Sequence, residues 1–544
     1  SWGKLIGATK DDGKEKRVAS YQYDYYNRMS AKSESVNGGD PVVTVYRYNQ
    51  WDQRTLRELR NGALRLTEEK TYDRFGRLSK IKSGSSEVIY YYNSFNQLEK
   101  RLINNVPEFY YYTKYGQLRA KTLGAEEDKN PLTSLKYFYS RPGMIVAREV
   151  NGARQNYKYD KKGQLLGVCD GKGNAVEEYV YDPAGNILKK TIQDRTTTYK
   201  YDKANQLVSS ECNGKVTKYE YDAAGRLVKE GDKEYHYIGL DKIESVTEGG
   251  QKLSSFTYHI DGQLAARISI ESSEEFQWDG LALIQRNNTN YVNEPAVTGG
   301  NPVLADNKVL FNDMLGTTLG VKDGDKVTQN NLTAFGESLG ASPMQDSFFT
   351  GKTLVGELGY AFLFRNYRAD QGKWNSQDPV ALSMTLPTAA DFSKNSSFVK
   401  ALGYPDGWNN LAYVNNNVIM YIDWSGCGWI PVSDSGIPSP YSQEPYSDPL
   451  SDVKLDPGYI AAQVVTTISY DYVLVDTISD SIPSNPLVGE TYSVYYIYIQ
   501  RQITSVQIQW RDLNYNWVNQ GAPTVTIRNT GNSVTRKVTY EFKE

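Results

Sequence analysis

Side chains that could support nucleophilic or metal chemistry are few in this sequence of 544 residues. The three cysteines, Cys169, Cys212 and Cys427, are odd in number and widely spaced, which fits neither a disulfide framework nor a zinc site. Cys427 has no evident general base, because both histidines, His236 and His259, lie far upstream of it. We therefore expect no metal, no cofactor and no metabolic enzyme activity.

Tyrosine is unusually abundant, with 44 copies, and many are followed by Asp, Asn or another polar residue. Such pairs open similar segments, most of them 20 to 22 residues apart, at Tyr23, Tyr48, Tyr72, Tyr92, Tyr112, Tyr139, Tyr159, Tyr181, Tyr201, Tyr221 and Tyr258. Read as chemistry, a Tyr–Asp pair could bind a ligand such as a sugar. Read as structure, Tyr packs across strands and Asp makes a turn. So many near-copies favour the structural interpretation, because a repeated unit must stack on its neighbours.

The fullest copies read Tyr-Asp-x-x-Gly-x-Leu, as in Tyr72–Leu78, Tyr159–Leu165 and Tyr221–Leu227. Asp starts a turn by accepting a hydrogen bond from the backbone two residues on, and Gly supplies the left-handed residue of a bulge. Tyr-x-Tyr before the turn places two rings on one face of a strand. Each repeat is thus predicted to be a β-hairpin. A lone hairpin is barely stable, so residues 1–285 are predicted to form one continuous, twisted antiparallel sheet.

These motifs resemble the YD repeats of Rhs proteins, of teneurins and of the C component of ABC-type toxin complexes. The resemblance extends over roughly residues 1–428. It implies an all-β fold in which a strip of hairpins spirals into a hollow shell. In that family the shell encloses the protein's own C-terminal segment.

A second group of motifs, at 286–428, resembles the Rhs-associated core domain. The matching segments are Phe311–Thr318, Ala334–Glu337, Phe349–Lys352, Arg365–Arg368, Gly372–Trp374, Asp378–Pro379 and Asn409–Asn417. We expect this core to close one end of the wall and to turn the chain inward. Residues 380–401 interrupt the motifs with small and polar residues and are predicted to be an inserted surface loop.

In cleaving members of this family, an aspartyl self-protease inside the shell cuts just after the core. The resemblance implies a cut here between Cys427 and Gly428, with Asp378, and then Asp423 or Asp370, as the candidate catalytic carboxylates. One carboxylate would act as base for a water molecule and one protonated carboxyl as acid, and two carboxyls that share a site split their pKa values in this way.

Two departures from the family pattern oppose self-cleavage. Arg368 stands where the family usually has Asp, and Trp424 stands where it has Pro. In the alternative interpretation Asp378 caps a turn before Pro379, and the core is a plain plug.

Beyond the core, residues 429–458 are rich in Pro, Ser and Asp and predict an extended linker. Residues 459–544 are predicted to be a variable, β-sandwich-like domain, because 463–475 and 492–510 are long runs of β-branched and aromatic residues. This tail has no His and no Cys, so contact is preferred to catalysis as its role. A pore-forming toxin and an ADP-ribosyl transferase stay open.

Composition bears on the partners and the location of the protein. A net charge of −3 opposes nucleic acid as a partner, and no apolar stretch is long enough for a transmembrane helix. Neither a signal peptide nor an initiator Met opens the chain, so we expect a fragment or a processed product. We expect a bacterial, extracellular or cell-surface shell that encloses or presents its C-terminal domain. The alternatives are a self-cleaving toxin carrier and an adhesin or filament subunit. The partners would be the chain's own C-terminal segment, a second copy or a cell-surface receptor.

Overall fold

The computed structural model describes most of the chain. The described residues are 5–11, 13–140, 143–238, 242–294, 300–340, 344, 346–377, 409, 411–423, 429–431, 459–479, 491–512, 517–519 and 524–541. The predicted loop at 380–401 and the predicted linker after Pro431 lie outside these residues.

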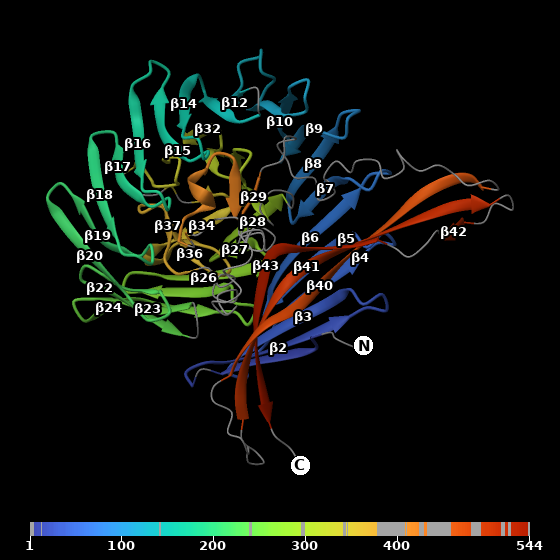
Figure 1. Cartoon of the computed structure of the whole chain (residues 1–544). Coiled ribbons are helices and arrows are strands. Elements are labelled where there is room, and N and C mark those ends of the chain that lie inside the picture. Colours follow the sequence, from blue (N-terminus) through green and yellow to red (C-terminus); the bar gives the residue numbers. More distant parts are fainter. Residues whose placement is uncertain are drawn as a thin grey trace. The chain divides into compact units, whose positions relative to one another are not determined.

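An antiparallel sheet of 32 strands, hereafter the wall, makes up the larger part of the structure (Figure 1). Each strand pairs with the next one in sequence, so that the wall is a chain of hairpins from Gly7 to Gln329 and continues past residue 285. The prediction of an all-β fold built from one continuous sheet of hairpins is confirmed.

The first sixteen strands are β1(Gly7–Asp11), β2(Lys16–Tyr23), β3(Met29–Val36), β4(Val42–Tyr48), β5(Arg54–Asn61), β6(Leu64–Tyr72), β7(Leu78–Ser83), β8(Ser86–Tyr92), β9(Leu98–Ile103), β10(Val106–Tyr112), β11(Leu118–Leu123), β12(Thr133–Tyr139), β13(Ile145–Val150), β14(Ala153–Tyr159), β15(Leu165–Asp170) and β16(Ala175–Tyr181). The second sixteen are β17(Ile187–Ile192), β18(Arg195–Tyr201), β19(Leu207–Cys212), β20(Lys215–Tyr221), β21(Leu227–Glu230), β22(Lys233–Ile238), β23(Lys242–Glu248), β24(Gln251–Tyr258), β25(Leu264–Ser269), β26(Ser273–Asp279), β27(Ala282–Arg286), β28(Thr289–Glu294), β29(Asn301–Ala305), β30(Lys308–Asn312), β31(Thr318–Asp323) and β32(Lys326–Gln329).

The Tyr–Asp turn has the predicted chemistry, as the turn between β14 and β15 illustrates. Asp160 Oδ1 accepts hydrogen bonds from the backbone N–H groups of Lys162 and Gln164, both at 2.8 Å. Gly163 has a φ of 84°, in the left-handed region that a side chain would strain. The strand register shifts at Tyr159, which is the expected bulge. The turn carboxylate is therefore occupied by its own backbone.

The second tyrosine of each Tyr-x-Tyr pair ties its hairpin to the one before. The Tyr159 hydroxyl donates to the carbonyl of Ile145 at 2.7 Å, and the Tyr181 hydroxyl donates to that of Leu165 at 2.6 Å. The same bond to an earlier strand recurs from Tyr48, Tyr72, Tyr92, Tyr112, Tyr139, Tyr201, Tyr237 and Tyr258, and Tyr23 bonds the carbonyl of Leu5 just before β1. The first tyrosine of the pair, such as Tyr179, lies buried in the core. The two rings thus lie on one face of the strand, but the first packs in the core and the second bonds the neighbouring hairpin.

The wall curls until hairpins far apart in sequence touch. Near its start, Arg54 forms an ion pair with Asp279 at 2.6 Å. Farther along, Lys121 donates to the carbonyl of Asn312 at 2.8 Å, and the Tyr137 hydroxyl accepts from the Met314 backbone at 3.1 Å. These contacts hold the later hairpins against the core-facing side of the earlier ones, as the predicted spiral requires.

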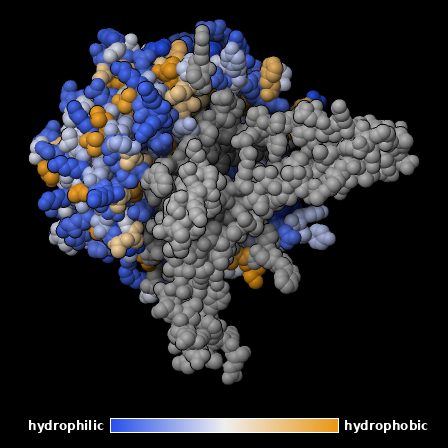
Figure 2. All heavy atoms as spheres, in the orientation of Figure 1, coloured by the Kyte–Doolittle hydropathy of each residue, from blue (hydrophilic) through white to orange (hydrophobic). Residues whose placement is uncertain are grey.

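The opposite side of the wall faces away from this core. Over β16–β24 it is mostly hydrophilic, with hydrophobic side chains scattered singly (Figure 2). Strand alternation explains the pattern, since every second side chain points away from the core.

A smaller group of strands, hereafter the plug, comprises residues 346–377, 409 and 411–423. Its five-stranded sheet contains β33(Phe348–Phe349), β34(Lys352–Val355), β35(Gly359–Ala361), β36(Asn366–Arg368) and β37(Lys373–Trp374). Two short 3-10 turns, η1(Gly356–Leu358) and η2(Val414–Asn416), and the strand β38(Tyr421–Asp423), complete it, and β38 pairs with β39(Trp429–Pro431). Aromatic rings in contact fill its interior, for example Phe349 stacked on Tyr367 at 5.6 Å and Tyr413 tilted against Tyr367 at 4.3 Å.

A separate compact unit contains the described strands of the tail, β40(Tyr459–Ser479), β41(Thr491–Asp512), β42(Trp517–Asn519) and β43(Thr524–Glu541). The predicted β structure is present, and both predicted runs fall within β40 and β41. Among the described residues, however, β41 pairs with all three other strands in one antiparallel sheet. The expectation of two facing sheets, as in a sandwich, is corrected to a single sheet of long strands.

The tyrosine bond between hairpins is testable with a variant that removes only a hydroxyl. We predict that Tyr181→Phe lowers the free energy of unfolding by about 1–2 kcal/mol, because the Leu165 carbonyl loses its donor. Tyr115→Phe, at a ring that is 75% exposed, should change it by less than about 0.5 kcal/mol. Urea unfolding followed by tyrosine fluorescence measures both values. Equal effects of the two variants would contradict the role given to the hydroxyl.

Candidate functional site: a charged cluster inside the plug

Three charged residues from separate core motifs meet in the interior of the plug. Lys352 lies on β34, Arg365 precedes β36 and Asp423 ends β38, and their exposed fractions are 2%, 1% and 1%. The Arg365 Nη2 atom lies 3.6 Å from Asp423 Oδ2. Charged groups this deeply buried persist only where they are paired or held by polar contacts, so the cluster is a built feature of the plug.

Aromatic rings form the surroundings of the two cations. The Arg365 guanidinium lies over the Trp374 ring at 4.1 Å, and the Lys352 ammonium lies 5.7 Å from the centre of the Phe362 ring. Such contacts stabilise a cation out of water by roughly 0.5–2 kcal/mol each. These contacts offset part of the free energy that burying the two cations costs, but not all of it.

Among the described residues, the cluster sets two cations beside one carboxylate. Burial lowers the pKa of Lys352 to about 8, and the charge of Asp423 opposes this shift only in part. Because the attraction is mutual, Lys352 and Arg365 favour the charged form of Asp423, whereas its burial opposes that form.

Asp370, another candidate carboxylate, contacts the wall instead. Arg368 Nε donates to its Oδ1 at 3.1 Å, and Arg368 also bonds Glu230 of β21 at 2.8 Å. Burial by itself would raise the pKa of Asp370, but the Arg368 guanidinium outweighs it and holds that pKa below its usual range. Arg368, which stands in the family's usual Asp position, therefore joins plug to wall.

The remaining predicted residues, Asp378, Cys427 and Gly428, lie outside the described part of the chain. Asp423 is nevertheless informative, because its Cα is paired with that of Trp429 in the β38–β39 hairpin. The predicted cut between residues 427 and 428 thus falls in the link between β38 and β39, which follows Asp423 in sequence. The assignment of Asp378, Asp423 and Asp370 to catalysis stays a prediction.

Lys352 and Arg365 were missed as site residues by the sequence analysis. Both stand in quoted motifs, Phe349–Lys352 and Arg365–Arg368, but no local pattern says that a Lys or Arg will be buried. Among the described residues, no group of three or more His, Cys, Asp and Glu side chains could hold a metal ion. Nor does any described helix reach the length and apolarity needed to cross a membrane.

Polar side chains of the plug bond the Tyr–Asp turns of the wall. The Lys373 ammonium donates to the carbonyl of Asn205 at 2.7 Å and lies over the Tyr201 ring at 4.1 Å. Two asparagines act in the same way: Asn409 donates to the side chain of Asn186 at 2.8 Å, and Asn416 donates to the Gly185 carbonyl at the same distance. The plug is therefore fixed to one rim of the wall by buried hydrogen bonds.

A wall of tyrosine-linked hairpins with a bonded plug defines the class of β-shell proteins. Within that class, residues 143–275 match the family described as teneurin YD-shell, so the prediction of a YD-repeat shell protein is confirmed. No curated protein has a significant match to the chain.

Several solved structures have similar folds, and two of them are described below. One is of the Photorhabdus luminescens Tc holotoxin pore with a TccC3 variant, at 12% identity and a TM-score of 0.48, covering 77% of this chain and 27% of that one. The other is the crystal structure of TcdB2-TccC3, at 12% identity and a TM-score of 0.42, covering 77% and 28%. The chain thus spans between a quarter and a third of the length of these proteins.

Lys373 should make stability depend on pH. Burial lowers its pKa from the ordinary 10.5 to about 7, against the opposing charges of Asp182 and Asp202. Between these two pH values the unfolded chain binds a proton that the folded chain does not, so stability should rise with pH by about 1.4 kcal/mol per unit. Lys373→Met should abolish this part of the rise.

Urea unfolding at pH 7, 8 and 9 measures the slope, with Lys203→Met, at an exposed lysine of a neighbouring turn, as the control. Lys352 titrates in the same direction near pH 8, so the clearest comparison is between pH 7 and 8. A slope that is unchanged in Lys373→Met would contradict the prediction.

Proposed function

We propose that this chain is a structural shell segment, extracellular and toxin-related, whose wall and plug hold its own C-terminal region. The observation that carries the proposal is the bonding of the plug to the turns of the wall through Lys373, Asn409 and Asn416. The plug comes before the tail in sequence and is joined to it by the predicted linker 429–458, so it is a point at which a shell could retain its cargo. The role is one of containment or presentation, without turnover of a metabolite.

Self-cleavage is the alternative that the plug supports. Asp423 lies beside two buried cations at the end of β38, just before the link that carries the predicted cut, and these cations favour a charged base. The acid would be Asp378, by motif position alone. In this proposal the shell is a carrier, and the tail is held by contact instead of by the peptide bond.

Intact-mass spectrometry of the purified chain distinguishes a plain shell from a self-cleaving carrier. A plain shell gives one species of full mass, whereas a carrier gives two fragments that meet at residues 427 and 428. If the chain is cut, Asp378→Asn should restore the full mass, and a cut that persists in this variant would eliminate Asp378 as catalyst. Gel filtration of the same sample tests retention: the tail should elute with the wall in either case, and a free tail fragment would sink the proposed containment.

A row of exposed rings favours a second function, assembly with another shell wall. Five successive Tyr–Asp-type turns carry a large aromatic residue at one position, with 64% to 81% exposure; this aromatic rim consists of Tyr26, Trp51, Phe75, Phe95 and Tyr115. In later turns the same position holds Ala184 or Ala204, and there plug side chains bond the backbone of the turns. The aromatic rim thus lies on the same series of turns, before the part that the plug contacts.

The spacing of these rings selects the occupant. Neighbouring hairpins are two strand spacings apart, about 10 Å, so the rings repeat with that period. A second wall of hairpins has the same period and can meet the row in register. We take a second copy of this chain as that partner, which makes the aromatic rim a surface for self-association.

Sedimentation velocity of the full chain tests this assembly. The wild type should dimerise at micromolar concentration, and the double variant Phe75→Ser with Phe95→Ser should weaken dimerisation by at least tenfold. Val208→Ser with Val216→Ser removes two exposed apolar side chains outside the aromatic rim and should leave it unchanged. A wild type that stays monomeric at 100 times that concentration, or a rim variant that dimerises normally, would refute the assignment.

A further inference from the structure

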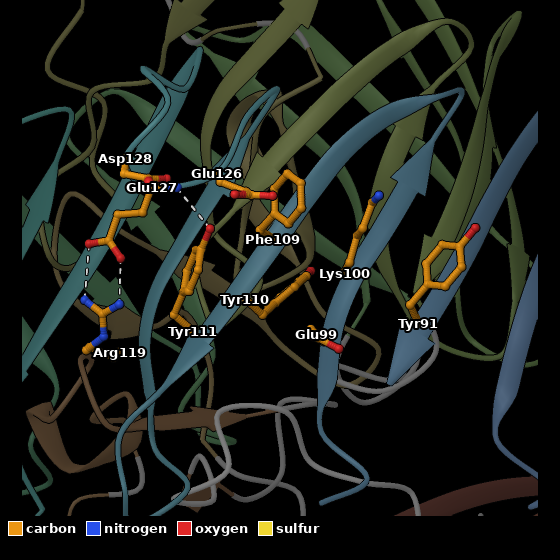
Figure 3. A pocket seen from close by; sticks show the side chains of 10 residues that line it. All are labelled: Tyr91, Glu99, Lys100, Phe109, Tyr110, Tyr111, Arg119, Glu126, Glu127 and Asp128. Carbon is orange, nitrogen blue, oxygen red and sulfur yellow. Dashed lines mark hydrogen bonds and ion pairs between the residues drawn. The ribbon is translucent and has the colours of Figure 1, made fainter. Parts of the chain in front are cut away.

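A groove on the outward face of β8–β11 is lined by aromatic side chains where a wall of this kind normally presents polar ones. Tyr91, Lys100 and Phe109 are directly opposite one another on three neighbouring strands, and Tyr111 follows Phe109 on the same face (Figure 3). The neighbours Tyr90 and Tyr110 are buried in the core, which confirms that the row points the other way. Tyr91 keeps 44% of its surface exposed.

One side of the groove is built by an extended link between strands. Most hairpins here are joined on this rim by two residues, as at Asn104 and Asn105, whereas the link between β11 and β12 runs from 124 to 132. Glu127 fixes this link over the sheet: its backbone donates to the Tyr111 hydroxyl at 3.0 Å, and its carboxylate pairs with Arg119 at 2.6 Å. The groove therefore has a defined shape before any ligand arrives.

The size and the remaining contacts of the groove describe an open site. Its volume is about 630 Å³, within the range of small-ligand and peptide pockets. The Lys100 ammonium lies between two rings, at 5.4 Å from the centre of Phe109 and 5.7 Å from that of Tyr91. This arrangement already shows that the rings accept a cation.

The charge of the residues that line the groove indicates which class of ligand can bind there. Four lining residues are acidic, Glu99, Glu126, Glu127 and Asp128, and two are basic, so the lining has a net charge of −2 (−4 + 2). Arg119 is occupied by Glu127, and Lys129, outside the groove, pairs with Glu126 at 2.9 Å. Among the described residues, neither Glu99 nor Asp128 has an ion-pair partner. The carboxylates of Glu99 and Asp128, which lie beside exposed rings, can therefore pair with a positive charge from a ligand.

The geometry points to a binding site for a basic peptide segment on the outside of the shell. An arginine or lysine side chain of the partner lies flat on Tyr91 or Phe109 and pairs with Glu99 or Asp128. Arginine fits best, because its planar guanidinium stacks on a ring and bonds a carboxylate with two N–H groups at once. The site is independent of the plug and of any cleavage.

Fluorescence anisotropy on the full chain tests this site, with a labelled hexapeptide of alternating arginine and glycine as the probe. The wild type should bind it with a Kd in the range of about 10–100 µM, more weakly at high salt, and should not bind the matching glutamate–glycine peptide. Glu99→Gln with Asp128→Asn should weaken binding about tenfold, as should Tyr91→Ser with Phe109→Ser. Val180→Ser, which removes an outward apolar side chain elsewhere on the wall, is the matched control.

Each outcome of these binding measurements either supports or contradicts the proposed site. The carboxylate variant changes only exposed side chains without ion pairs, so it keeps the test decisive even if the aromatic variant fails to fold. Loss of affinity in that variant, with the control unchanged, supports the site. No binding by the wild type, equal binding of the acidic peptide, or unchanged affinity in the carboxylate variant overturns it. Binding of an uncharged oligosaccharide in place of the arginine peptide would overturn the ligand class.

Discussion

The hydrogen bond from a tyrosine hydroxyl to a backbone carbonyl of the preceding hairpin is the interaction on which the wall depends. It recurs along the sheet at nearly every repeat, and at one position Trp278 replaces Tyr and donates through its ring nitrogen to Leu264. The carbonyl it reaches stands at the start of a strand, where the bulge disturbs the regular ladder. A ring long enough to reach the neighbouring strand and carrying a single polar tip meets this need, which explains the abundance of tyrosine.

This bond makes the wall a nearly one-dimensional structure, in which each hairpin is held mainly by its neighbours. Such a strip would curl with a range of radii if nothing else acted on it. Buried ion pairs between distant hairpins supply the missing constraint. Arg101 on β9 bonds Glu108 on β10 and Glu294 on β28, and Lys121 joins the same group. Each charge is costly to bury unless its own partner is present, so these pairs favour one way of closing the curl over others.

The plug has buried charged side chains both at its centre and at its edge. At the centre, Arg365 and Lys352 flank Asp423 at the end of β38, within a layer of aromatic rings. At the edge, Lys373 donates to turn carbonyls and pays for its burial with a lowered pKa. The turns that carry alanine accept the plug, and the turns that carry Trp51, Phe75 or Phe95 remain exposed. The choice of residue at one turn position thus marks where the plug ends.

The sequence by itself determined the repeating unit. The Asp–Gly spacing reports a turn, and Tyr-x-Tyr reports a strand face, because both depend on residues only a few positions apart. The resemblance also named Asp423, and the order of its motifs placed a plug after the wall. Only the tertiary structure decided that Lys352 and Arg365 join Asp423, that Asp370 faces the wall through Arg368, and that the tail strands form one sheet. Those arrangements bring together residues up to some 140 positions apart, and they depend on the radius of the curl, which the packing of the whole wall sets and no local pattern encodes.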